Sequence, residues 1–240
     1  MANRKKSPSK TSKSRTARNR GILGWGLRIS AGIFLVLVFA IVLFAVFNPP
    51  TTIYIAQEGR RLGKAPDREW VPFERMAPVM IRSVVAAEDA NFCIHWGFDL
   101  PAIKKAIEDG GTRGASTLSQ QVVKNVYLWH GRTYSRKAME AVMTPLLELI
   151  WSKRRILEVY LNVAEFDEGV FGVEAAARHY FGTTAAELSP VQAARLAALL
   201  PDPKGRSAAK PSNFVRKRAA QIMDGASTIE ADGRARCFQG

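Results

Sequence analysis

Two adjacent carboxylates, Glu88 and Asp89, precede an aromatic residue and a histidine in the stretch E88-D-A-N-F-C-I-H95. On a helix, Glu88, Phe92 and His95 lie at positions i, i+4 and i+7 and share one face, whereas Asp89 points about 100° away. A carboxylate on an apolar helix can act as a general base, because burial raises its pKa and neighbouring cations lower it. Alone, such an acidic pair is more often part of a solvent-exposed face, and a lone histidine near a helix end is more often a hydrogen-bonded structural residue.

A run of hydroxyl, amide and basic side chains follows in S116-T-L-S-Q-Q-V-V-K-N125. Thr117, Gln121 and Lys124 recur at i, i+4 and i+7, which predicts a polar stripe along one face of a helix. Further cations and a second acid come soon after this run, at Arg132, Arg136, Lys137 and Glu140. Clustered Lys and Arg with Ser, Thr and Gln donors can hold phosphate oxygens and stabilise the charge that grows as a phosphate departs.

Arg136 and Glu140 alone would be interpreted as an exposed i,i+4 ion pair, which contributes only a few tenths of a kcal/mol to stability. In combination with Glu88 they suit a more specific task. An enzyme that acts on an ordinary glycoside needs a protonated acid for its poor leaving group. A diphosphate leaving group needs cations instead, so these residues favour a base-assisted transfer in which a diphosphate departs.

Helices must position these groups, because nearly all of the chain after residue 70 shows helical periodicity. The pattern predicts a helix over 80–95 that ends at Gly97, where a left-handed cap carries little strain. Asp99 is the predicted N-cap of a short helix that ends at Glu108.

Thr117 and Gln120 form a predicted capping box, which opens a helix that ends at about Leu128. The segment from Tyr54 to Trp70 is predicted to be extended or irregular. No pattern of alternating residues is longer than about four, so no strand is predicted. Further helices are predicted over 136–152, with a kink or break at Pro145, and over 153–163, 172–181, 189–200 and 213–224. The predicted fold class is all-α.

An uncharged, apolar run of nineteen residues covers 29–47. Its length is close to the about 20 residues that an α-helix needs to cross a bilayer core. It is longer than the usual apolar part of a signal peptide and no small-residue cleavage site follows it, so an anchor is favoured over a removed signal. Residues 1–28 contain nine Lys or Arg and no acid. The positive-inside rule therefore predicts a cytoplasmic N-terminus, with residues 48–240 on the other side of the membrane.

The formal net charge of +14 admits nucleic acid, an anionic membrane surface or an anionic substrate as a partner. The place of the basic tail beside the apolar run favours lipid headgroups over nucleic acid. A chain of 240 residues suffices for one well-buried domain with a short appendage. Cys93 and Cys237 have no zinc or redox spacing, and the sequence does not decide whether they form a disulfide.

Six segments, in order, resemble the motifs of the peptidoglycan glycosyltransferases, glycosyltransferase family 51. They are E88-D-A-N-F-C-I-H-W-G-F-D99, G114-A-S-T-L-S-Q-Q-V-V-K-N125, R136-K-A-M-E140, K153-R-R-I-L-E-V-Y-L-N162, G169-V-F-G-V-E-A-A-A-R-H-Y-F-G182 and L188-S-P-V-Q-A-A-R-L-A-A-L-L200. The resemblance covers about residues 70–220 and implies a lysozyme-like helical domain. We expect a monofunctional member, because the partner motifs of a transpeptidase are missing and N162-V-A-E-F-D-E-G169 is similar to the monofunctional transglycosylases of Gram-negative bacteria.

The resemblance implies that Glu88 is the base that deprotonates the 4-hydroxyl of the acceptor's N-acetylglucosamine. That oxygen would attack C1 of the N-acetylmuramic acid on the growing lipid-linked chain, invert it from α to β and release undecaprenyl diphosphate. Glu140 matches the second acid of the family's cleft, which positions donor groups or supports the first acid. Asp89, Phe92 and His95 would shape the acceptor side. The donor's sugar and diphosphate would be bound by Ser116, Thr117, Gln120, Gln121, Lys124, Asn125, Arg132 and Arg136.

Mg²⁺ or Mn²⁺ on the diphosphate is also implied, with substrate oxygens and water as most of its ligands, because no protein segment reads as a metal cage. The implied partners are lipid II, the lipid-linked glycan chain, membrane lipids and the cell-wall synthesis machinery, with no nucleic acid. The sequence departs from the family pattern at Ala115, where many members have glycine, and at Thr183, where many have lysine. The apolar segment 70–80 is expected to rest on the membrane.

The expected organisation is a basic cytoplasmic tail (1–28), a transmembrane helix (29–47), a linker (48–69), the glycosyltransferase domain (70–225) and a C-terminal tail (226–240). The protein is expected in the bacterial inner membrane with a periplasmic catalytic domain. One alternative is a lytic enzyme on the same scaffold that uses Glu88 as a general acid, which leaves the cations without a purpose. Another is a non-catalytic membrane scaffold whose basic tail binds lipid or nucleic acid.

Overall fold

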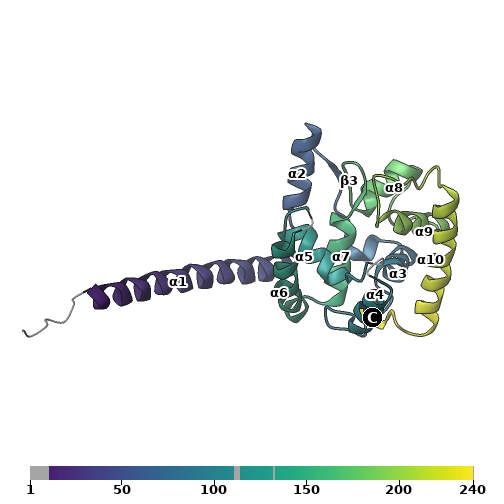
Figure 1. Ribbon diagram of the computed structural model, residues 1–240. Coiled ribbons are helices and arrows are strands. Elements are labelled where there is room, and N and C mark those ends of the chain that lie inside the picture. Colours follow the sequence, from purple (N-terminus) through teal and green to yellow (C-terminus); the bar gives the residue numbers. More distant parts are fainter. Residues whose placement is uncertain (1–10, 111–113, 132, 240) are drawn as a thin grey trace, which may run out of the picture. The chain divides into compact units, whose positions relative to one another are not determined.

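The computed structural model describes residues 11–110, 114–131 and 133–239. It divides into two units, residues 1–46 and 47–240. In the first unit, α1 runs from Thr11 to Val46, and its stretch Gly24–Val46 is 23 residues long and apolar enough to cross a membrane (Figure 1). At 1.5 Å per residue this stretch extends about 35 Å, more than the about 30 Å of a bilayer hydrocarbon core.

The regular structure of the second unit is mainly helical with little sheet, which confirms the predicted all-α, lysozyme-like class (Figure 1). Its α-helices are α2 (Ile53–Leu62), α3 (Pro78–Glu88), α4 (Leu100–Glu108), α5 (Leu118–Tyr127), α6 (Tyr134–Ile150), α7 (Lys153–Val163), α8 (Val173–Phe181), α9 (Pro190–Leu199), α10 (Asn213–Ala231) and α11 (Arg236–Gln239). A 3₁₀ helix covers Phe73–Arg75.

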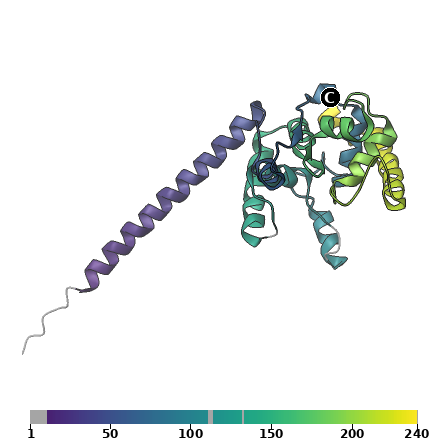
Figure 2. The same cartoon turned by 90° about the horizontal axis from the view of Figure 1, so that it is seen from above.

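Two groups of helices make up the core. In one, α5 packs against α6 and α7; in the other, α3 packs against α9 and α10. Figure 2 shows α10, the longest yellow helix, beside α9 and α3. Phe92, Leu118, Phe166 and other apolar side chains of this core are fully buried. Each such side chain contributes roughly 1.5–3 kcal/mol to folding when it leaves water.

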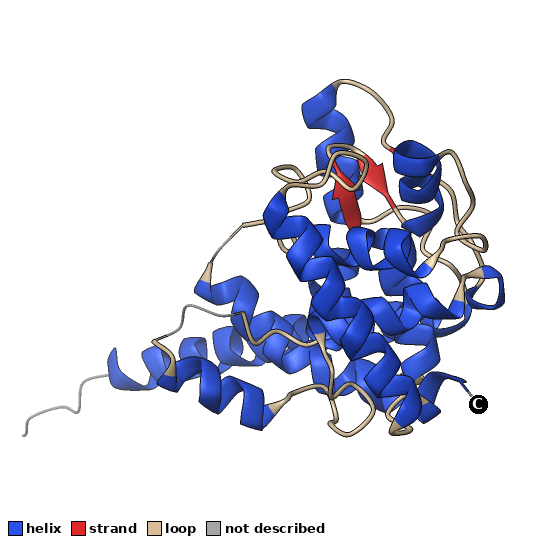
Figure 3. Cartoon of the chain, turned by 90° about the vertical axis from the view of Figure 1, so that its right-hand side faces the viewer, coloured by secondary structure: helices blue, strands red, loops and turns tan. Residues whose placement is uncertain are grey.

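A small sheet joins the start of the second unit to its middle (Figure 3). Strand β1 (Asp67–Arg68) pairs in parallel with β3 (Val170–Phe171), and β3 pairs antiparallel with β2 (Glu165–Asp167). Strands of two or three residues are too short to produce an alternating pattern, so the sequence did not predict them.

Helix α2 lies where an extended or irregular segment was predicted, and that prediction is wrong. Thr52 caps the helix by accepting a hydrogen bond from Ile55 N over 3.2 Å, and Gly63 closes it in the left-handed conformation at φ 66°. Gly59 does not break the helix but lets it pack closely, because a Cβ there would lie 3.0 Å from Pro66 Cδ.

The helix predicted over 80–95 ends at Glu88 instead, so Glu88, Phe92 and His95 do not share a helical face. Asp89 leaves the helical conformation at φ −160° and ψ 71°. Its carboxylate accepts a hydrogen bond from Leu118 N over 3.0 Å and pairs with His95 Nε2 at 2.8 Å. These contacts with a distant helix and with the following turn outweigh the local helical pattern.

Most of the predicted helix ends are confirmed. Asp99 accepts from Ala102 N over 2.9 Å, and capping boxes form at Thr117 and at Ser189. Pro145 lies inside α6 without dividing it. Helix α10 continues to Ala231, beyond the predicted end at residue 224.

Segments expected to be a linker and a tail carry ordered structure in the second unit. Residues 48–69 contain α2 and β1, and Arg68 donates hydrogen bonds to Pro49 O and Pro50 O, each over 2.9 Å. Residues 226–240 contain the end of α10 and α11.

The segment 70–80 was expected to rest on the membrane. Much of its apolar surface belongs instead to the core, because Val71, Phe73, Met76 and Met80 are all buried.

Candidate active site

Glu88 is the last residue of α3, and its carboxylate meets α5. Gln121 Nε2 donates a hydrogen bond to Glu88 Oε2 over 2.8 Å. Burial is the main influence on the pKa of Glu88 and raises it. The polar and charged groups that act on it are Gln121, Lys124, Arg218 and Asp89. A raised pKa makes a carboxylate a better proton acceptor near neutral pH, as a general base requires.

Tyr160 of α7 determines which way the Gln121 amide points. Tyr160 is buried, and its hydroxyl donates a hydrogen bond to Gln121 Oε1 over 3.1 Å. Because the amide oxygen accepts and the amide nitrogen donates, this bond turns the Gln121 nitrogen toward Glu88. Burial and the charge of Glu88 raise the pKa of Tyr160 well above its usual value, so the hydroxyl keeps its proton. Tyr160 is not among the predicted site residues. The one feature of the sequence that could have indicated a role for it is its place in the motif segment 153–162.

Lys124 of α5 lies in the field of two acids. Burial lowers the pKa of Lys124, whereas the charges of Glu140 and Glu88 raise it. Arg136 and Lys137 of α6 lower it again, since a second positive charge nearby disfavours the ammonium form. The packing of α5 against α6 therefore brings the predicted base, the cations and the second acid into one electrostatic neighbourhood.

Arg136 and Glu140 form a buried ion pair, not the exposed pair that the two residues alone would suggest. Arg136 Nη1 lies 2.8 Å from Glu140 Oε2, and the two side chains are only 10% and 3% exposed. Arg136 Nε also donates to Gly131 O over 2.6 Å, and Lys137 binds the other oxygen of Glu140. Glu140 is thus held by two cations, which leaves Glu88 as the acid best suited to accept a proton.

A comparison with known protein families agrees with this arrangement. Residues 56–229 match the family model described as Transglycosylase. This chain belongs to the transglycosylase family. The resemblance noted in the six motif segments is therefore confirmed.

Named relatives are similar in sequence to this transglycosylase over most of its length. The biosynthetic peptidoglycan transglycosylase of Jannaschia sp. (strain CCS1) is 58% identical over 214 residues, 89% of each chain. A relative of the same name from Caulobacter vibrioides is 45% identical over 216 residues, 85% of this chain and 93% of the relative. Another, from Pseudomonas fluorescens (strain SBW25), is 49% identical over 205 residues, 82% and 85% of the two chains.

Three residues predicted on the acceptor side of this transglycosylase face the protein interior. Phe92 is fully buried, and the side chains of Asp89 and His95 are 2% and 8% exposed. Both carboxylate oxygens of Asp89 are already hydrogen-bonded, Oδ1 to His95 and Oδ2 to the backbone N–H of Leu118 at the N-terminus of α5. Direct contact with substrate does not fit this burial, so these residues support the site from behind.

The residues predicted on the donor side divide into two kinds. Thr117 and Gln120 are buried and cap α5, and Thr117 Oγ1 also donates to Gly97 O over 2.7 Å. Asn125 is buried as well. Gln121 and Lys124 are partly exposed, and Ser116 is exposed with its hydroxyl 3.4 Å from Lys137 Nζ. Arg132 lies outside the described residues.

Arg218 is a second residue that the sequence reasoning missed. It lies on α10, and its Nη2 donates to Ala87 O over 3.0 Å, one residue before Glu88. Its charge also lowers the pKa of Glu88. The segment 213–224 was predicted only as a helix, and nothing in its local pattern indicated contact with residues 131 positions earlier.

Proposed function

We propose that this transglycosylase polymerises the glycan strands of peptidoglycan, with lipid II as the acceptor and the lipid-linked growing chain as the donor. The observation that carries the proposal is the Glu88 carboxylate, which is held by Gln121 and lies in the field of Lys124. The names of the relatives support the same substrate class.

In the proposed reaction, Glu88 takes the proton from the 4-hydroxyl of the acceptor's terminal N-acetylglucosamine. The hydroxyl oxygen forms a bond to C1 of the donor's N-acetylmuramic acid, on the side opposite the leaving group. The bond between C1 and the diphosphate oxygen breaks, C1 inverts from α to β, and undecaprenyl diphosphate leaves with the electron pair. Glu88 then returns its proton to solvent before the next transfer.

The positive side chains near Glu88 are proposed to stabilise the departing diphosphate. Lys124 and Arg136 are the described cations that support this role, with Ser116, Gln121 and Arg132 as further donors. Glu140 holds Arg136 and Lys137, so its proposed task is to position cations rather than to accept a proton.

Mg²⁺ or Mn²⁺ is proposed to bind mainly to the substrate's diphosphate. Among the described residues, no group of three or more His, Cys, Asp or Glu side chains is arranged to hold a metal ion. The two acids of the site are already engaged, Glu88 by Gln121 and Glu140 by its two cations. When bound, the ion would neutralise diphosphate charge, with phosphate oxygens and water as its ligands.

The proposed location is the bacterial inner membrane, with the N-terminus in the cytoplasm and the catalytic unit in the periplasm. The basic residues that precede the apolar helix support this orientation. A disulfide joins Cys93 to Cys237, and disulfides persist in oxidising compartments such as the periplasm. Membrane lipids and the cell-wall synthesis machinery are the proposed partners.

Exposed apolar side chains offer a surface for contact with lipid. Helix α4 has no buried residue, and its Leu100 and Ile107 are 69% and 72% exposed. Ile94 and Trp96, in the turn before α4, are 70% and 56% exposed. Large apolar groups left in water at this density favour a membrane or protein partner.

The decisive experiment supplies the purified full-length protein with labelled lipid II and Mg²⁺. We expect a ladder of glycan polymers, whereas polymeric peptidoglycan stays intact. Glu88→Gln should lower turnover by about 10²–10⁴-fold, because it removes the base but keeps the shape of the side chain. Circular dichroism checks that the variant stays folded.

Other outcomes would favour the alternatives. Cleavage of peptidoglycan without polymer formation would support a lytic enzyme. Full polymerisation by Glu88→Gln would contradict the assignment of the base. Charge reversals in the basic tail that matter more than Glu88 would support a membrane scaffold.

A further inference from the structure

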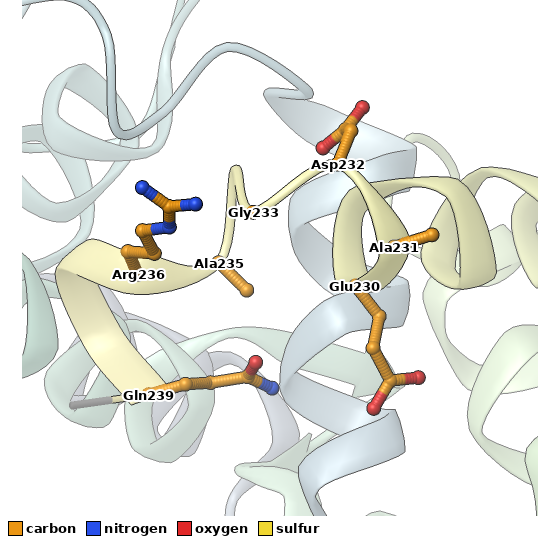
Figure 4. Close-up of a pocket in the computed structure, with 7 residues that line it drawn as sticks. All are labelled: Glu230, Ala231, Asp232, Gly233, Ala235, Arg236 and Gln239. Carbon is orange, nitrogen blue, oxygen red and sulfur yellow. The ribbon is translucent and has the colours of Figure 1, made fainter.

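The end of the chain folds back onto the region of Glu88. Helix α10 ends at Ala231, the chain turns at Gly233, and α11 follows. We call residues 230–239 the C-terminal clamp. Side chains of the clamp line a cavity of about 460 Å³. Figure 4 shows these side chains, with Glu230 at the end of α10 and Arg236 at the start of α11.

Two arginines connect α10 and the clamp to the backbone on both sides of Glu88. Arg218 Nη2 donates to Ala87 O over 3.0 Å. Arg234 Nη1 donates to Ala90 O over 3.3 Å. The acceptors are carbonyl groups at, or just beyond, the end of α3. The last carbonyl groups of a helix have no partner within the helix, so the two arginines supply one.

A covalent connection reinforces these hydrogen bonds. Cys237 of α11 forms a disulfide with Cys93, five residues after Glu88. Phe238 anchors the clamp in the core, since its side chain is only 1% exposed. Within the clamp, Arg234 Nη2 lies 2.7 Å from Asp232 Oδ2. A fixed clamp can transmit its position to the turn that it binds.

Glu88 needs such support because it is the last helical residue of α3. Helix ends fray when the residues after them are not held. The chain from Asp89 to Gly97 contains turns and bends rather than a further helix or strand. The position of the Glu88 carboxylate therefore depends on what fixes this turn.

We propose that the C-terminal clamp, joined through the Cys93–Cys237 disulfide, is a positioning element for Glu88, and that full transferase activity requires the oxidised form. The inference rests on the proposed role of Glu88 as the base. The groups that face Glu88 are Gln121 and Lys124 from α5, Arg218 from α10, Tyr160 from α7 and the neighbouring Asp89. Reduction removes none of these groups but loosens the turn that begins at Asp89.

The test compares the full-length protein before and after reduction, at a temperature well below its unfolding transition. We expect kcat on lipid II to fall by about 10-fold with little change in KM. A small displacement of a catalytic group slows the chemical step but leaves substrate binding nearly unchanged. The acid limb of the pH profile should move to lower pH, since a loosened turn admits water to Glu88 and its pKa falls. Reoxidation should restore both.

Two matched variants sharpen the test. The double variant Cys93→Ser/Cys237→Ser should show the lowered kcat and no response to reductant. Arg234→Ala should lower kcat several-fold, whereas Arg236→Ala, which removes the same charge from the same segment, should not. Circular dichroism and the unfolding temperature identify any variant that loses its fold.

Reduced protein that stays folded and keeps its kcat and its pH profile would overturn the proposal. If Glu88→Gln polymerises as well as the native protein, the base assignment fails instead. The two failures are distinguishable because the reduction experiment leaves Glu88 in place.

Discussion

At the scale of single residues, the proposed role of Glu88 as the base depends on how its carboxylate is kept ionisable where water solvates it poorly. Burial raises its pKa, and the amide of Gln121 limits that rise by donating a hydrogen bond to the carboxylate. Tyr160 in turn keeps the amide in the donating orientation. The Glu88 carboxylate is thus tuned by two linked side chains, Gln121 of α5 and Tyr160 of α7.

The raised pKa of Glu88 predicts a specific pH dependence. The rate constant kcat/KM should fall with decreasing pH as Glu88 takes up a proton in the free enzyme. Because the pKa is raised, this acid limb should lie above the usual value of about 4.3 for glutamate. A measured limb at or below that value would contradict the assignment.

Tyr160→Phe tests the orienting role of the tyrosine. Without its hydroxyl the Gln121 amide can turn and present its oxygen to Glu88, which raises the pKa of Glu88 further. We expect the acid limb to move to higher pH and kcat to fall, with a stability loss of only about 0.5–1.5 kcal/mol.

Tyr180→Phe is the matched control for this experiment. Tyr180 also loses a hydrogen-bonding hydroxyl, which donates to Asp167 over 2.8 Å, but it lies on α8. It should leave the pH profile unchanged. A profile that moves equally in both variants would exclude a specific role for Tyr160.

At the scale of elements, the turn from Asp89 to Gly97 connects Glu88, the proposed base, to helix α5. Asp89 binds the N-terminus of α5, and Thr117 of α5 binds Gly97 O. Gly97 has φ +84°, and a Cβ there would lie 2.8 Å from Thr144 Cγ2 of α6. The turn is therefore fitted between α5 and α6 with no room for a larger residue.

Gly97→Ala should destabilise the protein by about 2–5 kcal/mol, which combines left-handed strain with a clash in the core. Gly182→Ala is the control, because Gly182 has φ +63° but open space where a Cβ would lie. It should cost only about 1–2 kcal/mol. Urea unfolding measures both values, and equal losses would show that contact with Thr144 is unimportant.

At the scale of the whole molecule, the disulfide joins the motif segment that begins at Glu88 to helix α11. It connects residues 144 positions apart, so it restricts the unfolded chain strongly. The bond that is proposed to position the Glu88 turn is thus also expected to stabilise the second unit as a whole.

Cys93→Ser/Cys237→Ser should lower the free energy of unfolding by roughly 2–5 kcal/mol under oxidising conditions. Reductant should bring the native protein to the same value and leave the variant unaffected. Equal stability of the oxidised native protein and the variant would show that the bond contributes nothing to the fold.

Local patterns in the sequence determined the apolar helix, most helix ends and the six motif segments. Caps such as Asp99 and Thr117 depend on residues three positions away, so their energy can be read from a short window. The order of the motifs likewise indicated the family before any geometry was known.

Only the tertiary structure decided where the helix that carries Glu88 ends, which groups tune it and what holds it. Asp89 leaves the helix to bind α5, 29 positions away, and Tyr160 meets Gln121 across 39 positions. Arg218 reaches Ala87 across 131 positions, and Cys93 pairs with Cys237. These contacts outweigh the local helical preference because each satisfies a buried polar group or forms a covalent bond. They could not be predicted from the sequence, because no short window of it contains both partners.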